Sequence, residues 1–428
     1  MTSVRSRYAN SKLLVLYIVG FVGPLSANTV LALVPTLMST FNADVGTVLL
    51  AITALMAPFA FFQLFTGTMS DVYGRRPVLA WGFLIYGIGL MIIGFSPHFN
   101  IWVFLGARFL CGIGFAFIGP VLPAAIGDLT KIEYRGKVIG VYSSVLAGGT
   151  ALGPLLAGFL ANEWWDIYFM LSGMAFLSLV LIWFVLGNVN EPKEIDIHLI
   201  KHVFAELKEV GSSKGVLALS AAGFLGFLGF VGVQSFLSET LSQPPLYLNS
   251  ESIGIILSIA GAVVIFLAPL FGYITDRWGR RKIAYVGLAV SVFSLFLLFL
   301  SQGFLTFLIS NAIYGVASNM FWLPLTAFSV ELTPKLRGAG SSLFNSARYF
   351  GYALAPYLLA PVFEGWATNK FSGFQIVTII SILIILLTIP LIIYVGRQKL
   401  PEMRLEKPEK VQNVSRKTRR EKIPPEDS

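Results

Sequence analysis

Two long apolar segments are separated by Gly67-Thr-Met-Ser-Asp71-Val-Tyr-Gly74-Arg75-Arg76-Pro77, and a near copy follows as Gly272-Tyr-Ile-Thr-Asp276-Arg277-Trp-Gly279-Arg280-Arg281-Lys282. The first glycines of the two copies are 205 residues apart, and so are the aspartates. One offset without gaps indicates an internal duplication. Glycine permits a tight reversal of the chain, and arginine can stay in a headgroup layer. Each copy is therefore predicted to be a short turn between two helices at a membrane surface.

The composition places the chain in a membrane. Of its 428 residues 56% are hydrophobic and 12% are charged, and the mean hydropathy is +0.76. That is too little charge for a soluble protein of this size. The single cysteine, Cys111, excludes an intrachain disulfide. The first apolar run, from about Leu13, is too long for a cleavable signal, so we expect it to remain as a transmembrane helix.

A membrane span needs about 20 apolar residues. On that rule the sequence predicts twelve helices, six in each half of an all-α polytopic membrane protein. The first six are expected near residues 13–38, 46–69, 78–96, 100–128, 138–161 and 166–187, and the second six near 215–239, 250–274, 283–301, 304–331, 339–363 and 374–396.

Lysine and arginine fix the expected orientation. They occupy the N-terminal tail, the linker between the halves, the loops after every second helix and the tail from Arg397, which alone holds ten. Only Lys370 falls on the opposite side, and only Arg108 and Arg348 fall inside predicted spans. Both termini are therefore expected in the cytoplasm of a cell-membrane protein, and the net charge of +9 is a topology signal rather than a nucleic-acid footprint.

The predicted organisation has five parts: a cytoplasmic tail (1–12), a six-helix bundle (13–187), a cytoplasmic linker (188–214), a second six-helix bundle (215–396) and a disordered basic tail (397–428). The linker has one apolar helical face, which we expect on the inner membrane surface. His198 and His202 have the spacing of a metal pair, but no acid or cysteine cluster completes a site, so no metal is predicted. The face comprises Ile197, Leu199, Ile200, Val203, Phe204, Leu207 and Val210.

The duplication extends beyond the turns. Asp128 corresponds to Glu331, Arg135-Gly136 to Arg337-Gly338, and Gly149-Thr-Ala-Leu-Gly-Pro154 to Gly351-Tyr-Ala-Leu-Ala-Pro356. Six helices that repeat in the same orientation require an axis along the membrane normal.

The two turns resemble the loops between helices two and three, and eight and nine, of the major facilitator superfamily. Val72 departs from the basic residue that often follows the aspartate there, whereas Arg277 keeps it. The resemblance implies a conformational gate that holds the halves together when the cavity opens outward. Partly wet ion pairs are each worth about 0 to 1 kcal/mol, enough to bias a balanced equilibrium. The gate residues would be Gly67, Asp71, Gly74, Arg75 and Asp128 in the first half, and Asp276, Gly279, Arg280 and Glu331 in the second.

Charges inside a span are costly and suggest function. Arg108, in Arg-Phe-Leu-Cys-Gly112-Ile-Gly114, is similar to the arginine of the family's fourth-helix motif, which the resemblance associates with proton or substrate coupling. The matching residue of the second half is Asn311, so the halves differ. Arg348 either binds an anionic solute or bonds backbone carbonyls, and the sequence leaves both open.

A string of small residues marks the fifth predicted helix. It is similar to the signature of drug and metabolite efflux antiporters in this superfamily, although Ala157 replaces one glycine, and helix packing alone would also explain it. The string comprises Gly140, Gly149, Gly153, Pro154 and Gly158.

No acid falls at mid-membrane. The first helix offers Ser26 and Asn28 where many antiporters place one, so a proton carrier would have to be Asp128, Glu239 or a less obvious group. Buried arginines without buried acids favour an anionic or weakly acidic solute. Further cavity candidates, on helices that line the cavity in this family, are Asn28, Tyr142, Gln234, Asn319 and Trp322.

These features predict a secondary transporter that exports small organic solutes by alternating access in exchange for protons. It would bind a small-molecule substrate and membrane lipids, act as a monomer and need no cofactor. No ATP-binding loop of the Gly-x-x-x-x-Gly-Lys-Ser/Thr type occurs. The alternatives are an uptake symporter or facilitator for organic anions, and a non-transporting membrane receptor. An enzyme is not expected, because no nucleophile, metal cluster or acid pair shares one depth.

Overall fold

The computed structural model describes residues 2–131, 134–186, 197–334, 336–365 and 369–398. The described residues form helices and no β-strand, which confirms the predicted all-α class. The first half contains α1 (Thr2–Phe41), α2 (Val45–Tyr73), α3 (Arg75–Phe95), η1 (Ser96–His98), α4 (Ile101–Ile118), α5 (Val121–Leu129), α6 (Arg135–Phe159), η3 (Ala161–Glu163) and α7 (Trp164–Val185). After α8 (Ile197–Gly211), the second half contains α9 (Lys214–Ser242), α10 (Ser250–Trp278), α11 (Arg280–Leu300), α12 (Phe304–Glu331), α13 (Arg337–Gly365), α14 (Lys370–Leu386) and α15 (Thr388–Arg397).

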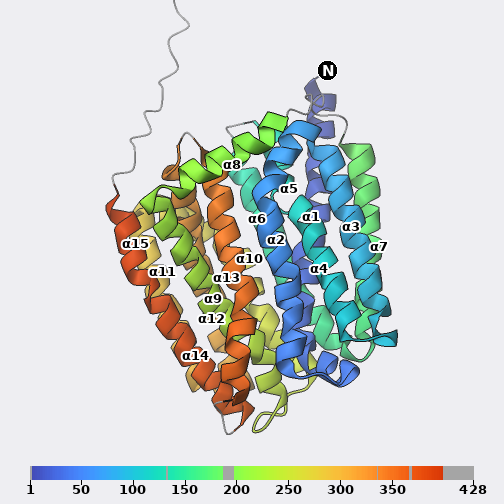
Figure 1. The fold of residues 1–428 in the computed structure, drawn as a ribbon, viewed down its shortest axis with the longest axis vertical. Coiled ribbons are helices and arrows are strands. Elements are labelled where there is room, and N and C mark those ends of the chain that lie inside the picture. Colours follow the sequence, from blue (N-terminus) through green and yellow to red (C-terminus); the bar gives the residue numbers. More distant parts are fainter. Residues whose placement is uncertain (1, 132–133, 187–196, 335, 366–368, 399–428) are drawn as a thin grey trace, which may run out of the picture. The chain divides into compact units, whose positions relative to one another are not determined.

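Eleven helical segments of the described residues are long and apolar enough to cross a membrane. The twelfth predicted span is α13, which has 29 residues but carries a polar stretch that includes Ser341, Ser342, Asn345, Ser346 and Arg348. This helix packs against α9 and α2, in the middle of the bundle (Figure 1). Neighbouring helices therefore shelter the polar groups that would be costly in lipid.

Two predicted helices are each broken in two. The span expected at 100–128 is α4 followed by α5, with the break at Gly119 and Pro120. The span expected at 374–396 is α14 followed by α15, with the break at Leu387, three residues before Pro390. Proline has no N–H to donate and its ring crowds the preceding turn, so the helix yields there. Each pair still acts as a single span in length and hydropathy.

The duplicated motifs form the predicted turns. Gly74 lies between α2 and α3 with φ of 90°, and Gly279 lies between α10 and α11 with φ of 87°. These angles suit glycine because a Cβ would clash with the backbone. We call the end of the bundle that carries these two turns the basic end.

The two halves meet along α6 with α10 and along α2 with α13. Several of their close contacts lie away from the basic end. Near the far ends of α6 and α10, a Cβ added to Gly158 would lie 2.9 Å from the Cα of Gly254, and the Ser238 hydroxyl of α9 donates to the Ala32 carbonyl of α1 at 3.4 Å. This is the arrangement expected when the space between the halves opens toward the basic end.

Helix α8 crosses the end of the bundle at which the N-terminus lies (Figure 1). Val203 and Val210 of the predicted apolar face are buried, and the Phe204 ring lies 5.5 Å from that of Phe65 on α2. The apolar face thus packs partly on the protein, and its placement on a membrane surface stays a prediction. The side chains of His198 and His202, and the predicted tail beyond residue 398, lie outside the described residues.

Candidate functional site

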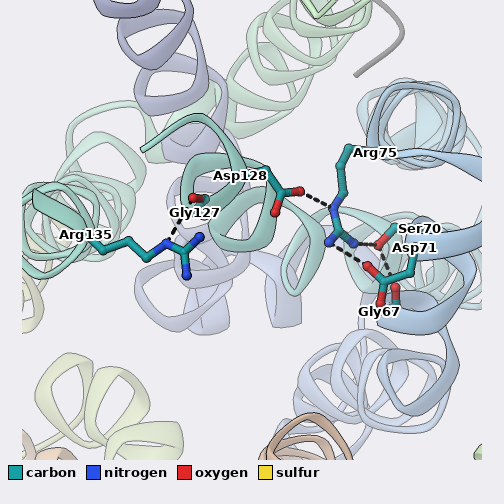
Figure 2. Close-up of polar contacts among 7 residues, drawn as sticks. All are labelled: Gly67, Ser70, Asp71, Arg75, Gly127, Asp128 and Arg135. Atoms are coloured by element: carbon teal, nitrogen blue, oxygen red, sulfur yellow. Dashed lines mark hydrogen bonds and ion pairs between the residues drawn. The ribbon is translucent and has the colours of Figure 1, made fainter. Parts of the chain in front are cut away.

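The predicted cluster of the first half forms at the basic end (Figure 2). Arg75, the first residue of α3, pairs with Asp71 one turn back on α2 at 2.5 Å and with Asp128 of α5 at 2.9 Å. Its third donor group reaches the hydroxyl of Ser70. Arg75 is nearly buried, whereas Asp71 is open to solvent. One guanidinium therefore joins three helices within one half.

The second half repeats part of this arrangement. Arg280, which begins α11, pairs with Glu331, which ends α12. The side chain of Asp276 lies outside the described residues, so its predicted partnership is untested. The ion pairs of Arg75 with Asp71 and Asp128, and of Arg280 with Glu331, each join residues of the same half. The gate role of these clusters stays a prediction.

The small residues of α6 contact different helices, depending on their position along α6. Gly149 and Gly153 face α1 of the same half, where a Cβ on Gly153 would lie 2.5 Å from the carbonyl of Leu25. Gly158 faces α10 of the other half, where a Cβ would lie 2.5 Å from the carbonyl of Ser250. A Cβ added to Gly140 would have no atom of a neighbouring helix within 4 Å. The helix continues through Pro154, which lines the cavity described below.

Arg108 of α4 is held by backbone. Its side chain is 1% exposed, and it donates to the carbonyls of Ala51 at 3.2 Å, Ser26 at 3.4 Å and Ala27 at 3.4 Å. These contacts tie α4 to α1 and α2. Arg108 is not among the described residues that line the cavity, so any coupling role would act through the helices it joins.

Asn311 makes the corresponding tie in the second half. Its amide donates to the carbonyl of Ile256 on α10 at 2.6 Å and accepts from Gln234 of α9 at 2.5 Å. Ile256 and Ala51 are 205 residues apart, the same offset as the turns. The two halves therefore use different side chains to bind equivalent carbonyls. Arg108, which is charged, binds that of Ala51, and Asn311, which is neutral, binds that of Ile256.

A cavity of about 610 Å³ lies between the halves. Its walls come from α1, α2, α4, α5 and α6 of the first half and from α9, α10, α12 and α13 of the second. Six of the seven predicted substrate or coupling residues line it, and Arg108 is the exception. They are Asn28, Tyr142, Gln234, Asn319, Trp322 and Arg348.

Arg348 is the charged residue among the described residues that line this cavity, and no carboxylate lines it there. Its Nη2 donates to the Tyr349 hydroxyl at 3.3 Å, and its Nε is buried with no hydrogen-bond partner among the described residues. The guanidinium carbon lies 4.8 Å from the ring centre of Tyr349 and 5.2 Å from that of Phe227. Ring faces attract a cation but do not neutralise it.

Aromatic side chains form a continuous wall beside Arg348. Phe227 is its centre, with ring centres of Trp322 at 4.2 Å, Tyr349 at 5.5 Å and Tyr352 at 5.8 Å. We call these four residues the aromatic wall. All four line the cavity, where aromatic side chains can pack against a flat solute.

Sequence reasoning missed several cavity residues. Gln63 of α2 and Asn345 of α13 line the cavity, and each has a buried polar atom without a partner among the described residues. Asn345 and Tyr352 stand three residues before and four residues after Arg348, so helical spacing from that arginine could have found them. Gln63 is a polar residue within an apolar run, and such a residue in a membrane span is expected to face a cavity or the bundle interior.

Glu239 is the buried acid that sequence reasoning named as a possible proton carrier. It lies on α9 next to Ser238, is 2% exposed, and its Oε2 has no hydrogen-bond partner among the described residues. The charges of Lys370 and Glu364 act on it from α14 and α13. It sits at the end where the halves touch. The other named acid, Asp128, is paired with Arg75 at the basic end.

Comparison with known proteins matches this architecture. The family model of the Major Facilitator Superfamily matches residues 16–356 and 237–424. Multidrug resistance protein 2 of Bacillus subtilis is 24% identical over 355 residues, covering 80% of this chain and 86% of that protein. Multidrug resistance protein MdtG of Klebsiella pneumoniae is 29% identical over 310 residues, covering 70% of this chain and 72% of that protein. These relatives confirm the resemblance to the efflux branch.

A solved structure agrees in fold. The bacterial homologue of the human lysosomal transporter Spinster, crystallised in an inward-facing and unoccupied conformation, superposes with a TM-score of 0.72 at 18% identity. The match covers 91% of this chain and 97% of that one. The fold and the family are those of multi-pass membrane transporters rather than enzymes.

Proposed function

Since the chain belongs to the major facilitator superfamily, we propose that it exports small organic solutes across the cell membrane by alternating access, in exchange for protons. The cavity between the two halves carries this proposal, because both halves supply its walls and some of their close contacts lie beyond it, at the end opposite the basic end. Export is favoured by relatives named as multidrug resistance proteins. The basic end would face the cytoplasm, as the lysines and arginines require.

Glu239 is the proposed proton site. The contact between Ser238 and Ala32 closes the end of the bundle beside it, so separation of α9 from α1 would bring water to its carboxylate. A buried carboxylate without a full set of partners favours its neutral form, and hydration favours its charged form. Proton uptake and release would thereby follow the conformational change. Lys370 and Glu364 would modulate this site with opposite signs.

The proposal is tested by solute flux in proteoliposomes with and without an imposed pH gradient. An exporter driven by protons accumulates solute on the side that supplies the protons, and Glu239→Gln should abolish the effect of the gradient while solute exchange continues. The matched control is Glu251→Gln, an exposed acid in the first turn of α10. Flux that ignores the gradient would reject proton exchange.

A facilitator or uptake symporter for organic anions is the second candidate, because Arg348 has no carboxylate partner in the described part of the cavity. The same flux assay separates it from the exporter. A facilitator equilibrates solute without a pH gradient, and a symporter accumulates it together with protons. If no member of a broad solute library moves, the receptor alternative is favoured over all three.

A further inference from the structure

The two arginines inside the predicted spans, Arg108 and Arg348, have opposite surroundings. Arg108 donates to three backbone carbonyls, so the protein itself satisfies its charge. Arg348 has one hydrogen bond, to a tyrosine hydroxyl, and takes part in no ion pair among the described residues. A charge held in a low-dielectric site without a counter-ion is unfavourable. Arg348 therefore stands where an anion would bind favourably.

The surroundings of Arg348 narrow the anion further. The aromatic wall of Phe227, Trp322, Tyr349 and Tyr352 lies beside the guanidinium and offers ring faces to a flat apolar body. Gln63, Asn319 and Asn345 each have a buried polar atom without a described partner in the cavity wall, which suits a solute with one or two polar substituents. A small inorganic anion would leave the ring faces unused.

We propose that the cavity binds monovalent organic anions with a flat aromatic body, the carboxylate meeting Arg348 and the ring packing on the aromatic wall. The inference rests on the proposed function, namely that this cavity holds the transported solute. It separates this chain from a carrier of lipophilic cations, since a cation would meet Arg348 with no acid of the described lining to offset it. Like charges in such a site repel strongly.

An anionic substrate makes transport electrogenic. With the cytoplasm negative by 100 mV, the potential alone would sustain an outward gradient of about 40-fold for a monovalent anion. A proton that enters in exchange adds a second charge in the same direction. Export of the anion should therefore respond to voltage even where the pH is equal on both sides.

The binding test uses three probes of one size, which are 2-naphthoate, 2-naphthamide and 2-naphthylmethylammonium. Calorimetry of the purified protein in phosphatidylcholine nanodiscs, which offer no anionic lipid to Arg348, should show naphthoate binding at least about 10-fold more tightly than naphthamide and no binding of the ammonium. Equal affinity for naphthoate and naphthamide, or tighter binding of the ammonium, would overturn the inference. This comparison needs no mutant and so does not depend on folding of a variant.

Variants locate the site. Arg348→Gln should weaken naphthoate binding by about 10- to 150-fold, the worth of a charge-assisted hydrogen bond, and leave naphthamide binding within about 3-fold. Arg348→Lys should retain part of the preference. Arg397→Gln removes the same charge from an exposed position at the end of α15 and should change neither affinity. Unchanged naphthoate affinity in Arg348→Gln would reject Arg348 as the anion site.

Flux distinguishes this inference from the proposed function. In proteoliposomes at equal pH, a valinomycin-imposed potassium potential should drive naphthoate toward the positive side more strongly than naphthamide, because naphthoate carries a charge in addition to that of the exchanged proton. If naphthamide or the ammonium probe is transported and naphthoate is not, the anion inference is wrong and the transporter stands. If none of the three probes moves but other library solutes do, the inference is likewise rejected. If no solute moves at all, both fail.

Discussion

At the scale of single residues, a position inside a membrane span does not by itself say what an arginine does. Arg108 and Arg348 both lie inside predicted spans, and the sequence offered either role for Arg348. The hydrogen bonds separate them, because three carbonyls hold Arg108 whereas Arg348 faces a cavity. Arg108, which bonds the backbone, is thus the arginine that resembles the one in the family's fourth-helix motif.

Replacement of Arg108 should act on stability more than on affinity. Arg108→Gln removes charge-assisted hydrogen bonds to carbonyls of α1 and α2, which should cost about 1.5 to 3 kcal/mol of unfolding free energy. We expect a lower melting temperature in nanodiscs and an unchanged KM for transported solute. A KM that rises as much as in Arg348→Gln, with stability intact, would show that Arg108 contacts the solute.

The turn glycines can be compared within one motif. Gly74 has φ of 90°, so Gly74→Ala should cost about 1 to 3 kcal/mol of folding free energy through backbone strain. Gly67, seven residues earlier, lies inside α2 with no atom within 4 Å of an added Cβ, and Gly67→Ala should be neutral or stabilising. Thermal unfolding of the two variants in detergent gives the comparison. Equal melting temperatures would contradict the strain at Gly74.

At the scale of elements, one sequence motif on α6 serves two interfaces. Gly149 and Gly153 let α6 approach α1 within its own half, and Gly158 lets it approach α10 of the other half. The contact of α6 with α1 holds one half together, whereas the contact of α6 with α10 must separate if the two halves move relative to one another. Gly153 follows Gly149 by one turn, whereas Gly158 lies about 180° around the helix from Gly149, so helical spacing separates the two faces. The spacing does not say which helix packs against each face.

Alanine substitutions along α6 should separate these tasks. Gly158→Ala places a methyl group 2.5 Å from the backbone carbonyl of Ser250, so the far ends of α6 and α10 must move apart. We expect a shift toward the conformation open at that end, seen as faster labelling there by a membrane-impermeant thiol reagent through an introduced cysteine, in a chain whose Cys111 is replaced by serine. Gly140→Ala meets no atom within 4 Å and should leave the labelling rate unchanged. Equal rates in both variants would contradict a role for this contact in closure.

At the scale of the whole molecule, the two halves are joined by few polar contacts. Thr53 of α2 donates to the Ala353 carbonyl of α13 at 2.6 Å, and Ser346 of α13 donates to the Ala60 carbonyl at 2.7 Å. The Ser238 hydroxyl of α9 donates to the Ala32 carbonyl of α1 in the same way. A hydrogen bond worth about 0.5 to 1.5 kcal/mol can bias a two-state equilibrium without fixing it.

Loss of one such bond should change the populations of the two conformations. Thr53→Val should shift the ratio about two- to ten-fold away from the conformation open at the basic end. Spin-label distances between the far ends of α1 and α9 measure this ratio. Thr66→Val is the matched control, because Thr66 donates to the Ala116 carbonyl within the first half at 2.8 Å. A shift of equal size in both variants would mean that the bond between the halves has no special part.

The sequence by itself determined the duplication, the all-α class, the glycine turns and six of the residues that line the cavity. These follow from local physics, since a run of apolar residues must become a helix in lipid and a repeated motif must fold alike twice. The sequence also predicted the partners of Arg75, because Asp71 lies in the same turn motif and Asp128 lies at the end of a predicted helix on the same side of the membrane. The breaks at Gly119-Pro120 and at Leu387 are local as well, and a stricter reading of proline would have found them.

Only the tertiary structure decided which arginine faces the cavity, that Gln63 and Asn345 join it, and that Glu239 is buried where the halves meet. Each of these depends on the rotation of a helix about its axis, and a turn of about 100° per residue moves a side chain from lipid to cavity within two positions. They also depend on contacts between residues far apart in the sequence, from 57 positions for Arg108 with Ala51 to 206 positions for Ser238 with Ala32. These membrane helices are apolar on most of their faces, so the hydropathy pattern does not say which face points to the cavity. The packing of one half against the other decides it.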